Sequence, residues 1–370
     1  MAGVDVLAAL TSSPLDLRPP VETIAHPTPT AGVPRSRPPA PNHPGRRILV
    51  CLDRSTLAEV CVPHAVSLAK TFGSEITLAH VMQPRHENGE PQTNDAFAWE
   101  ISRQEARDYL ERRQNEVSQV LGRPVDIRLE QGRPDERIVD LATEVSADLI
   151  LLGSRGEGGA TAGALGSTVL QVLSTARTSL FIAHACSGAA PEATPKRILV
   201  PLDGSPRSES ALPAAARIAS AYGGELLLVH VVQEPLPTAL LPTSEDMELA
   251  QKLARLLESG AKRYLERLTR QLEFQVASMR ALVLRHASPA QCLLEISQKE
   301  RADLIVLSAH GSACDSSRSF GSVTASLLTH TTLPVLTLQD LPEPQPRNAH
   351  GADATLAPPS PRASFAAASA

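Results

Sequence analysis

The stretch best suited to chemistry is glycine-spaced and runs from Gly153 to Ser167. An apolar run ends directly before it, and a helical pattern begins where it ends. A glycine loop between a strand and a helix N-terminus can bind an anion, because backbone N–H groups and the helix dipole point at the ligand. Gly153 and Gly156 would let the backbone approach a ribose or phosphate and would permit positive φ. Gly166, Ser167 and Thr168 would supply free N–H groups and a hydroxyl.

Two charged side chains are expected at the same place. Asp53 follows the first apolar run, and an aspartate there can accept hydrogen bonds from a sugar hydroxyl or a base amine. Arg155 lies inside the glycine stretch, where its guanidinium fork could bind a phosphate. The residues alone leave alternatives open: a tight turn at the glycines, an N-cap at Ser167 and a solvated arginine. The stretch matches neither the P-loop nor the G-x-G-x-x-G dinucleotide pattern.

Length and composition set the broad class. The chain has 370 residues, enough for two ordinary domains and tails, and its net charge of -5 argues against a general nucleic-acid binder. No apolar run approaches the length of a membrane span, and no basic start of a secretory signal is present. The five cysteines show no metal-ligand spacing. We therefore expect a cytoplasmic protein that binds neither membrane nor nucleic acid and has no metal site of its own.

Proline density marks the two ends of the chain. Residues 1–45 hold ten prolines without sustained periodicity, and residues 341–370 are rich in Pro, Ala and Ser. Such composition blocks helices and sheet ladders, so both stretches are predicted to be disordered tails.

The part between the tails is an internal repeat. The sequence Arg-Ile-Leu-Val-x-Leu-Asp ends at Asp53 and recurs ending at Asp203, an offset of 150. Tyr-Leu-Glu-Arg begins at Tyr109 and recurs at Tyr264, an offset of 155. A repeat of this length is a duplicated domain. We predict one domain at 46–186, a linker at 187–195 and a second domain at 196–340.

Each copy alternates short apolar runs with helical patterns, which predicts a parallel sheet covered by helices on both faces. In the second copy, Ser244 is the N-cap candidate of a long helix whose apolar face is predicted from several large side chains. These side chains are Leu249, Leu253, Leu256, Leu257, Tyr264 and Leu268. The predicted strands lie at 47–52, 75–82, 125–130, 148–153 and 179–184, then at 197–202, 225–232, 279–284, 303–308 and 334–339.

Both copies resemble universal stress protein domains. The nucleotide-binding members of that family share G-x2-G-x9-G-[ST], which Gly153, Gly156, Gly166 and Ser167 match in full. The resemblance places the first-strand aspartate of ATP-binding members on Asp53 and the adenine-contacting backbone on Val81. It implies a flavodoxin-like, Rossmann-type α/β fold with five strands in order 3-2-1-4-5 in each domain. It also implies ATP, with or without Mg²⁺, and pairing of the two domains through their last strands, while further pairing of whole chains stays open.

The second copy departs from this pattern at its first glycine, which is replaced by Ser308. If Ser308 must adopt the conformation of Gly153, backbone strain follows, and Asp315 would repel phosphate. We therefore expect the second site to bind nucleotide weakly or to serve as a structural partner. The retained candidates of this copy are Asp203, Val231, Gly311, Gly321 and Ser322.

The expected function is that of a regulatory, ATP-binding stress-response module, with nucleotide mainly in the first domain. Two alternatives remain open: a slow ATP hydrolase, and a nucleotide-free interaction module. The sequence offers no evident catalytic base beyond Asp53, which argues for a poor catalyst at most.

Overall fold

The structure is a computed structural model that describes residues 46–83, 86–87, 90–91, 96–156, 165–184, 193–234, 243–312 and 318–339. The predicted tails at 1–45 and 341–370, most of the predicted linker and Asp315 lie outside these described residues.

The first domain alternates strands and helices as the sequence predicts, with one break. The helical pattern of residues 56–72, which suggests one helix, forms two helices that are divided at Val60. A short antiparallel pair that the sequence did not indicate, β3 (His86–Glu87) and β4 (Glu90–Pro91), follows the second strand. The other elements are β1 (Arg47–Cys51), α1 (Thr56–Glu59), α2 (Cys61–Phe72), β2 (Glu75–Met82), α3 (Ala96–Leu121), β5 (Asp126–Gln131), α4 (Pro134–Glu144), β6 (Leu149–Gly153), α5 (Ser167–Thr175) and β7 (Ser179–Ala183).

The second domain repeats this order of elements. Its elements are β8 (Arg197–Pro201), α6 (Pro206–Glu209), α7 (Leu212–Tyr222), β9 (Glu225–Gln233), α8 (Ser244–Leu272), β10 (Ser278–His286), α9 (Pro289–Lys299), β11 (Leu304–Ser308), α10 (Ser322–His330) and β12 (Val335–Leu338).

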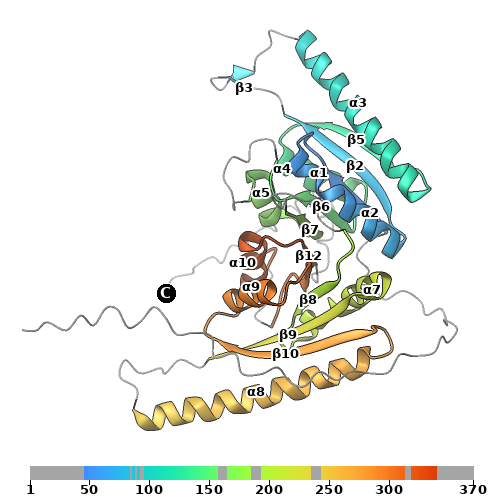
Figure 1. Ribbon diagram of the computed structural model, residues 1–370. Helices are drawn as coiled ribbons and strands as arrows, with labels where there is room; N and C mark the ends of the chain where they lie inside the picture. Colours follow the sequence, from blue (N-terminus) through green and yellow to red (C-terminus); the bar gives the residue numbers. More distant parts are fainter. Residues whose placement is uncertain are drawn as a thin grey trace, which may run out of the picture.

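The two domains share one ten-stranded sheet, in the order β10-β9-β8-β11-β12-β7-β6-β1-β2-β5. Each half has the predicted order 3-2-1-4-5, and all pairs within a half are parallel. The halves meet where β7 pairs antiparallel with β12, with Leu336 opposite Phe181 (Figure 1). The expected pairing through the last strands is therefore present within one chain. Because this junction is antiparallel, the carboxyl ends of the strands point in opposite directions in the two domains.

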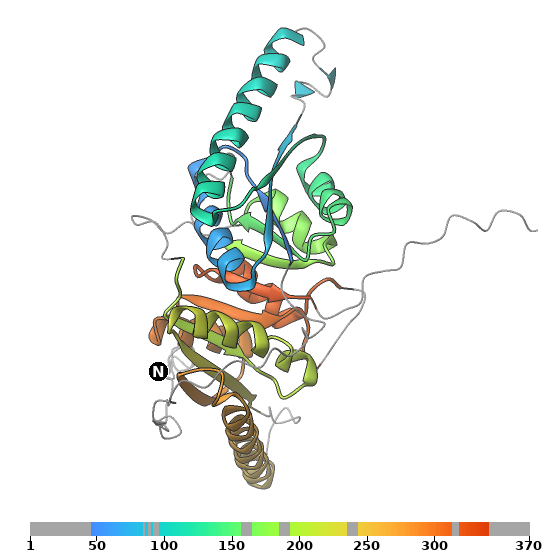
Figure 2. The same cartoon turned by 90° about the vertical axis from the view of Figure 1, so that its right-hand side faces the viewer.

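Two hydrophobic cores lie on the two faces of the sheet, and each runs through both domains. One is formed with α2, α3, α7 and α8, and the other with α4, α5, α9 and α10. Strand side chains alternate between them, since Ile48 and Val50 belong to the first core and Leu49 to the second. The long helices α3 and α8 lie at opposite ends of the molecule (Figure 2).

Polar contacts add to the strand pairing between the domains. The hydroxyl of Tyr222 in α7 donates to the carbonyl oxygen of Ser67 in α2 at 2.8 Å. Arg217 donates from Nε to the carbonyl oxygen of Thr71 at 3.0 Å, and its guanidinium lies 5.1 Å from the ring centroid of Phe72. Helices α2 and α7 therefore join the domains on one face of the sheet.

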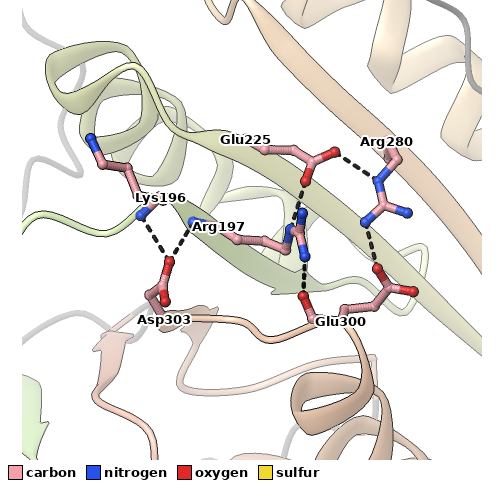
Figure 3. A network of polar contacts seen from close by, with 6 residues as sticks. All are labelled: Lys196, Arg197, Glu225, Arg280, Glu300 and Asp303. Atoms are coloured by element: carbon pink, nitrogen blue, oxygen red, sulfur yellow. Dashed lines mark hydrogen bonds and ion pairs between the residues drawn. The ribbon is translucent and has the colours of Figure 1, made fainter. Parts of the chain in front are cut away.

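The amino ends of the strands in the second domain are held by a network of ion pairs, shown in Figure 3. The Glu225 carboxylate accepts from Arg197 Nε at 2.6 Å and from Arg280 Nε at 2.7 Å. Arg280 also pairs with Glu300 at 2.5 Å, which joins β10 to the end of α9. The backbone N–H of Arg197 donates to Asp303. The network therefore joins neighbouring strands of the second domain at their amino ends, away from the carboxyl ends.

Helix α8 differs from its prediction in two respects. Its N-cap is Thr243, one residue before the predicted Ser244, because Thr243 and Asp246 form a capping box in which each side chain accepts from the other's backbone N–H. The predicted apolar face is also wrong in part. The side chains buried against the domain are Ala254, Ala261, Leu265, Leu268 and Leu272, whereas Leu249, Leu253, Leu256 and Leu257 are exposed.

Candidate functional site

The predicted site residues of the first domain gather at the carboxyl ends of β1 and β6. These strands are neighbours in the sheet, with Cys51 opposite Leu152, and β1 pairs with β2 on its other side. The strand order of the sheet reverses between β1 and β6. Open α/β sheets bind their ligands at such a point. Asp53 follows β1 by two residues, and Gly153 is the last residue of β6.

Asp53 is fixed by the turn that follows it. Its Oδ1 accepts from the backbone N–H of Ser55 at 3.0 Å and from the Ser55 hydroxyl at 2.6 Å. Ser55 also caps α1, since its Oγ accepts from the N–H of Ala58. The other carboxylate oxygen, Oδ2, lies against Gly156, where a Cβ would come within 2.0 Å of it. A side chain at 156 would therefore displace the carboxylate.

Gly153 has a different role from the one its spacing suggested. Neither Gly153 nor Gly156 adopts the positive φ that a glycine permits. A Cβ on Gly153 would instead lie 2.8 Å from the Cα of Ala58 and 2.9 Å from the carbonyl oxygen of Leu57. The glycine thus allows α1 to pack directly on β6, and it brings the start of α1 close to Asp53.

Val81 presents its backbone toward the site, as strand geometry requires. The carbonyl of Ala79 faces β1, because it accepts from the N–H of Leu52 at 2.8 Å. The carbonyl of Met82 faces β5, because it accepts from the N–H of Gly132 at 3.0 Å. Since backbone groups alternate in direction along a strand, those of Val81 point toward β1. The pairing of β1 with β2 ends at Cys51, so Val81 faces the space beyond that strand.

The loop after β6 is closed at its base. The N–H of Gly166 donates to the carbonyl oxygen of Ser154 at 2.9 Å, and residues 157–164 between them lie outside the described part. Gly166 is the N-cap of α5, so Ser167 and Thr168 are its first two residues, and the open alternative of an N-cap at Ser167 does not hold. Their N–H groups belong to the first turn, which has no acceptors within the helix.

Arg155 is half-buried at the start of this loop, close to His184 at the end of β7. Burial lowers the pKa of His184 to about 4, and the positive charge of Arg155 acts in the same direction. His184 is therefore neutral at pH 7, and Arg155 supplies the positive charge at this place. The arrangement offers donors and a cation for phosphate, and a carboxylate for hydroxyls or amines.

The second domain repeats the geometry around its aspartate. Asp203 accepts from the N–H and hydroxyl of Ser205, a Cβ on Gly311 would lie 2.2 Å from its Oδ2, and the N–H of Ser312 donates to Oδ2 at 2.6 Å. Burial alone would raise the pKa of Asp203, but these hydrogen bonds lower it to about 2. Val231 faces the end of β8 in the same way as Val81 faces that of β1, because the carbonyl of Val229 accepts from Leu202. Gly321 is the N-cap of α10 and Ser322 its first residue.

The expected strain at Ser308 is wrong, because its φ is not positive. The residue is buried, and its hydroxyl donates to the carbonyl oxygen of His310 at 2.6 Å. His310 stands where the first domain has Arg155, and it is almost fully buried with Nε2 3.0 Å from the carbonyl oxygen of Arg318. The side chains of Ser308 and His310 thus form contacts within the second loop itself.

Two groups near the site were missed by sequence reasoning. Ser55 and Ser205 fix the aspartates, and the repeated Asp-x-Ser before a helix could have revealed them. Glu59 of α1 accepts from the Tyr109 hydroxyl at 3.0 Å and from Arg113 at 2.7 Å, which ties α1 to α3. The repeated Tyr-Leu-Glu-Arg marked the tyrosine but gave no sign of its partner.

Other chemistry finds little support among the described residues. They contain no group of three His, Cys, Asp or Glu side chains that could hold a metal ion. Burial raises the pKa of the Cys51 thiol to about 12, so it carries no thiolate at neutral pH. His80 is buried with Nδ1 2.7 Å from the carbonyl oxygen of Leu52, as a core histidine would be.

Fold and site together define a tandem pair of Rossmann-like domains with a glycine-spaced segment after the fourth strand of each sheet half. The model of the universal stress protein family matches residues 45–184 and 194–339, and the chain belongs to this stress-response family. A universal stress protein of Mycolicibacterium smegmatis is 28% identical over 300 residues, which are 79% of this chain and 96% of that protein. One of Mycobacterium tuberculosis is 30% identical over 210 residues, which are 55% of this chain and 65% of that protein.

Solved structures agree with this fold. A universal stress protein from Archaeoglobus fulgidus superposes with a TM-score of 0.56 at 18% identity, covering 80% of this chain and 98% of the other. A putative universal stress protein from Pseudomonas aeruginosa gives 0.53 at 15% identity, covering 79% and 92%. Within the described ranges, no helix combines the length and apolar character needed to cross a membrane.

Proposed function

We propose that the protein binds ATP as a regulatory ligand, mainly in its first domain. The observation that carries the proposal is the convergence of an acceptor and donors at the ends of two neighbouring strands. Asp53 is held beside Gly156, and the first turn of α5 opens toward the same edge of the sheet. Asp53 and the backbone of Val81 would bind the ribose and adenine, and Gly166, Ser167 and Thr168 would bind the phosphates.

The preference for the first domain rests on side chains of the two loops. Arg155 offers a guanidinium to the phosphates, whereas the equivalent His310 is buried and engaged with its own loop. A guanidinium–phosphate contact is a charge-assisted hydrogen bond, which is about twice as strong as a neutral one. The second domain keeps Asp203, Val231, Gly311, Gly321 and Ser322 in place, so it would bind nucleotide more weakly. Any Mg²⁺ would be held mainly by the phosphates and water.

Helix α5 connects the proposed nucleotide site with the second domain. Its N-terminus is the cradle of the first site, and at its other end the carbonyl oxygen of Ser174 accepts from the hydroxyl of Ser319 at 3.0 Å. Ser319 lies two residues before Gly321, the N-cap that opens the second cradle. A small shift of α5 on binding ATP would therefore move the loop of the second domain.

The phosphate part of the proposal is tested by the affinities for ATP, ADP and AMP, measured calorimetrically. The protein should bind ATP most tightly and AMP least tightly. In Arg155→Gln the affinity for ATP should fall about tenfold, as expected from the loss of one charge-assisted hydrogen bond, with little change for AMP. Arg285→Gln, on β10 of the second domain, is the control. Equal losses for ATP and AMP in Arg155→Gln would contradict the assignment of Arg155 to the phosphates.

A further inference from the structure

The first turns of α8 project from the second domain. From Ser244 to Leu253 every residue is exposed except Ala250, which is half-buried, whereas the turns from Ala261 onward pack on the domain. Figure 2 shows this helix extending beyond the sheet at one end of the molecule. The projecting turns thus lack the packing that holds the rest of the helix.

The projecting part carries an apolar stripe on one side. Leu249, Leu253 and Leu256 are 68%, 44% and 69% exposed, and they are followed on the same side by Gly260. Their spacings of four, three and four residues are those of a coiled-coil seam. Leu257, which is about half exposed, lies beside the stripe. We call these four positions, 249, 253, 256 and 260, the α8 stripe.

Nothing among the described residues requires a glycine at position 260. Glycine in the middle of a helix is destabilising relative to alanine. A Cβ built on Gly260 would meet nothing within 4 Å, so neither close packing nor positive φ requires glycine here. A small residue on an exposed seam does provide a hollow for a large side chain from a second helix.

We propose that the α8 stripe is the contact surface of a homodimer, in which the α8 helices of two copies pack antiparallel across a two-fold axis. The stripe is self-complementary in this orientation. Leu253 packs against Leu256 of the second copy, and Leu249 enters the hollow at Gly260 of the second copy. The axis repeats both contacts, as an isologous interface requires.

The charges along α8 fit the same register. The first turn carries Glu245, Asp246 and Glu248, and in the antiparallel pair it lies beside the turn of the second copy that carries Lys262 and Arg263. A parallel pair in register would instead place the acidic turns together. Charge complementarity therefore selects the antiparallel dimer.

The α8 stripe is present in the second domain but has no counterpart in α3 of the first domain. When the helices are aligned on Tyr109 and Tyr264, the positions of Leu253, Leu256 and Gly260 correspond in α3 to Ala98, Ile101 and Glu105. Glu105 forms an ion pair with Arg54 at 3.4 Å, so this position serves the first domain itself. The dimer would consequently form through α8, and the tandem domains would lie on either side of it.

The test is the mass of the full chain in solution, measured by light scattering and by sedimentation over a range of concentrations. The protein should have twice the mass of one chain. Leu253→Glu with Leu256→Glu should have the mass of one chain, with unchanged helix content by circular dichroism. Leu170→Glu, at an exposed leucine of α5, is the matched control and should remain a dimer. A single-chain mass for the unaltered protein at all concentrations, or a dimer that survives the double substitution, would overturn the proposal.

A second variant tests the register. Gly260→Leu favours the helix of a lone chain but fills the hollow, so the dimer should dissociate at least tenfold more readily. In a background without Cys186 and Cys314, a mixture of Leu253→Cys and Leu256→Cys chains should form disulfide-linked pairs faster than either variant alone. Equal rates, or a tighter dimer in Gly260→Leu, would contradict this register. Binding of ATP should be unaffected by these substitutions, so the result is independent of the proposed nucleotide site.

Discussion

Gly156 and the carboxylate of Asp53 are in such close contact that a Cβ on the glycine would lie 2.0 Å from Oδ2. Gly311 and Asp203 repeat the relationship at 2.2 Å. The second glycine of each loop thus leaves room for the aspartate that follows the first strand of the domain. The glycine motif and the aspartate, about a hundred residues apart in sequence, form one structural unit.

Gly156→Ala should therefore act on ATP binding through Asp53. The added methyl group would push the carboxylate from its hydrogen bonds with Ser55, which should cost about 1–2 kcal/mol and weaken ATP binding about tenfold or more. Gly311→Ala is the matched control in the second domain. Gly311→Ala should lower the melting temperature about as much as Gly156→Ala does. It should change the affinity of the first site for ATP by less than about twofold. An unchanged ATP affinity in Gly156→Ala would show that the position of the carboxylate does not matter for binding.

The glycine spacing does not reveal what each glycine does in the structure. The match to G-x2-G-x9-G-[ST] points to the end of β6, where Gly153 is the last residue of the strand. The roles of Gly153 and Gly156 depend on Ala58 and Asp53, which come close only after the first strand, α1 and β6 have assembled. Local sequence pattern carries no such information, and for the same reason strain at Ser308 was wrongly expected.

Arg54 and Gly204 occupy the same position after the two aspartates, and both have positive φ, 69° and 87°. A non-glycine residue in this region costs about 1–2 kcal/mol. The compensating Arg54–Glu105 pair at 3.4 Å is exposed, so it contributes less than about 1 kcal/mol. Arg54→Gly should thus stabilise the protein by about 1 kcal/mol in urea unfolding, and Gly204→Arg should destabilise it. Destabilisation by Arg54→Gly would mean that the ion pair outweighs the backbone strain.

The network around Glu225 should make stability depend on pH. Burial raises the pKa of Glu225, but hydrogen bonds from Arg280 and Arg197 lower it, and the net shift is downward. A carboxyl with a lowered pKa in the folded state stabilises above its unfolded pKa of about 4.3, and this contribution is lost as the pH falls through the folded pKa. Glu225→Gln should therefore lose stability at pH 7 and approach the unaltered protein in acid.

The contribution of the same network to stability is also tested by replacing Arg280. Arg280→Met should cost about 1–2 kcal/mol in urea unfolding at pH 7, because Glu300 loses its partner and Glu225 loses one of two. Arg103→Met, which breaks the exposed pair with Glu100, is the control and should cost about 0.5 kcal/mol or less. Equal effects of the two substitutions would contradict a stabilising role for the network.

The long helix α8 shows a further limit of sequence reasoning. The leucines at 249, 253, 256 and 257 follow a helical period, and this predicted the helix correctly. Periodicity does not reveal which of two apolar sides faces the domain, and the structure buries the side with Ala254, Ala261 and Leu265. The sheet order and the pairing of last strands, in contrast, were predicted correctly through the resemblance of both copies to universal stress protein domains.

Calorimetric titration of the full chain with ATP tests the central claim most directly, together with Asp53→Ala and Asp203→Ala. The protein should bind one ATP tightly per chain. In Asp53→Ala the affinity for ATP should fall about tenfold or more, whereas in Asp203→Ala it should stay unchanged, since Asp203 lies in the second domain. The absence of tight binding, or its loss in Asp203→Ala but not in Asp53→Ala, would contradict an ATP site in the first domain.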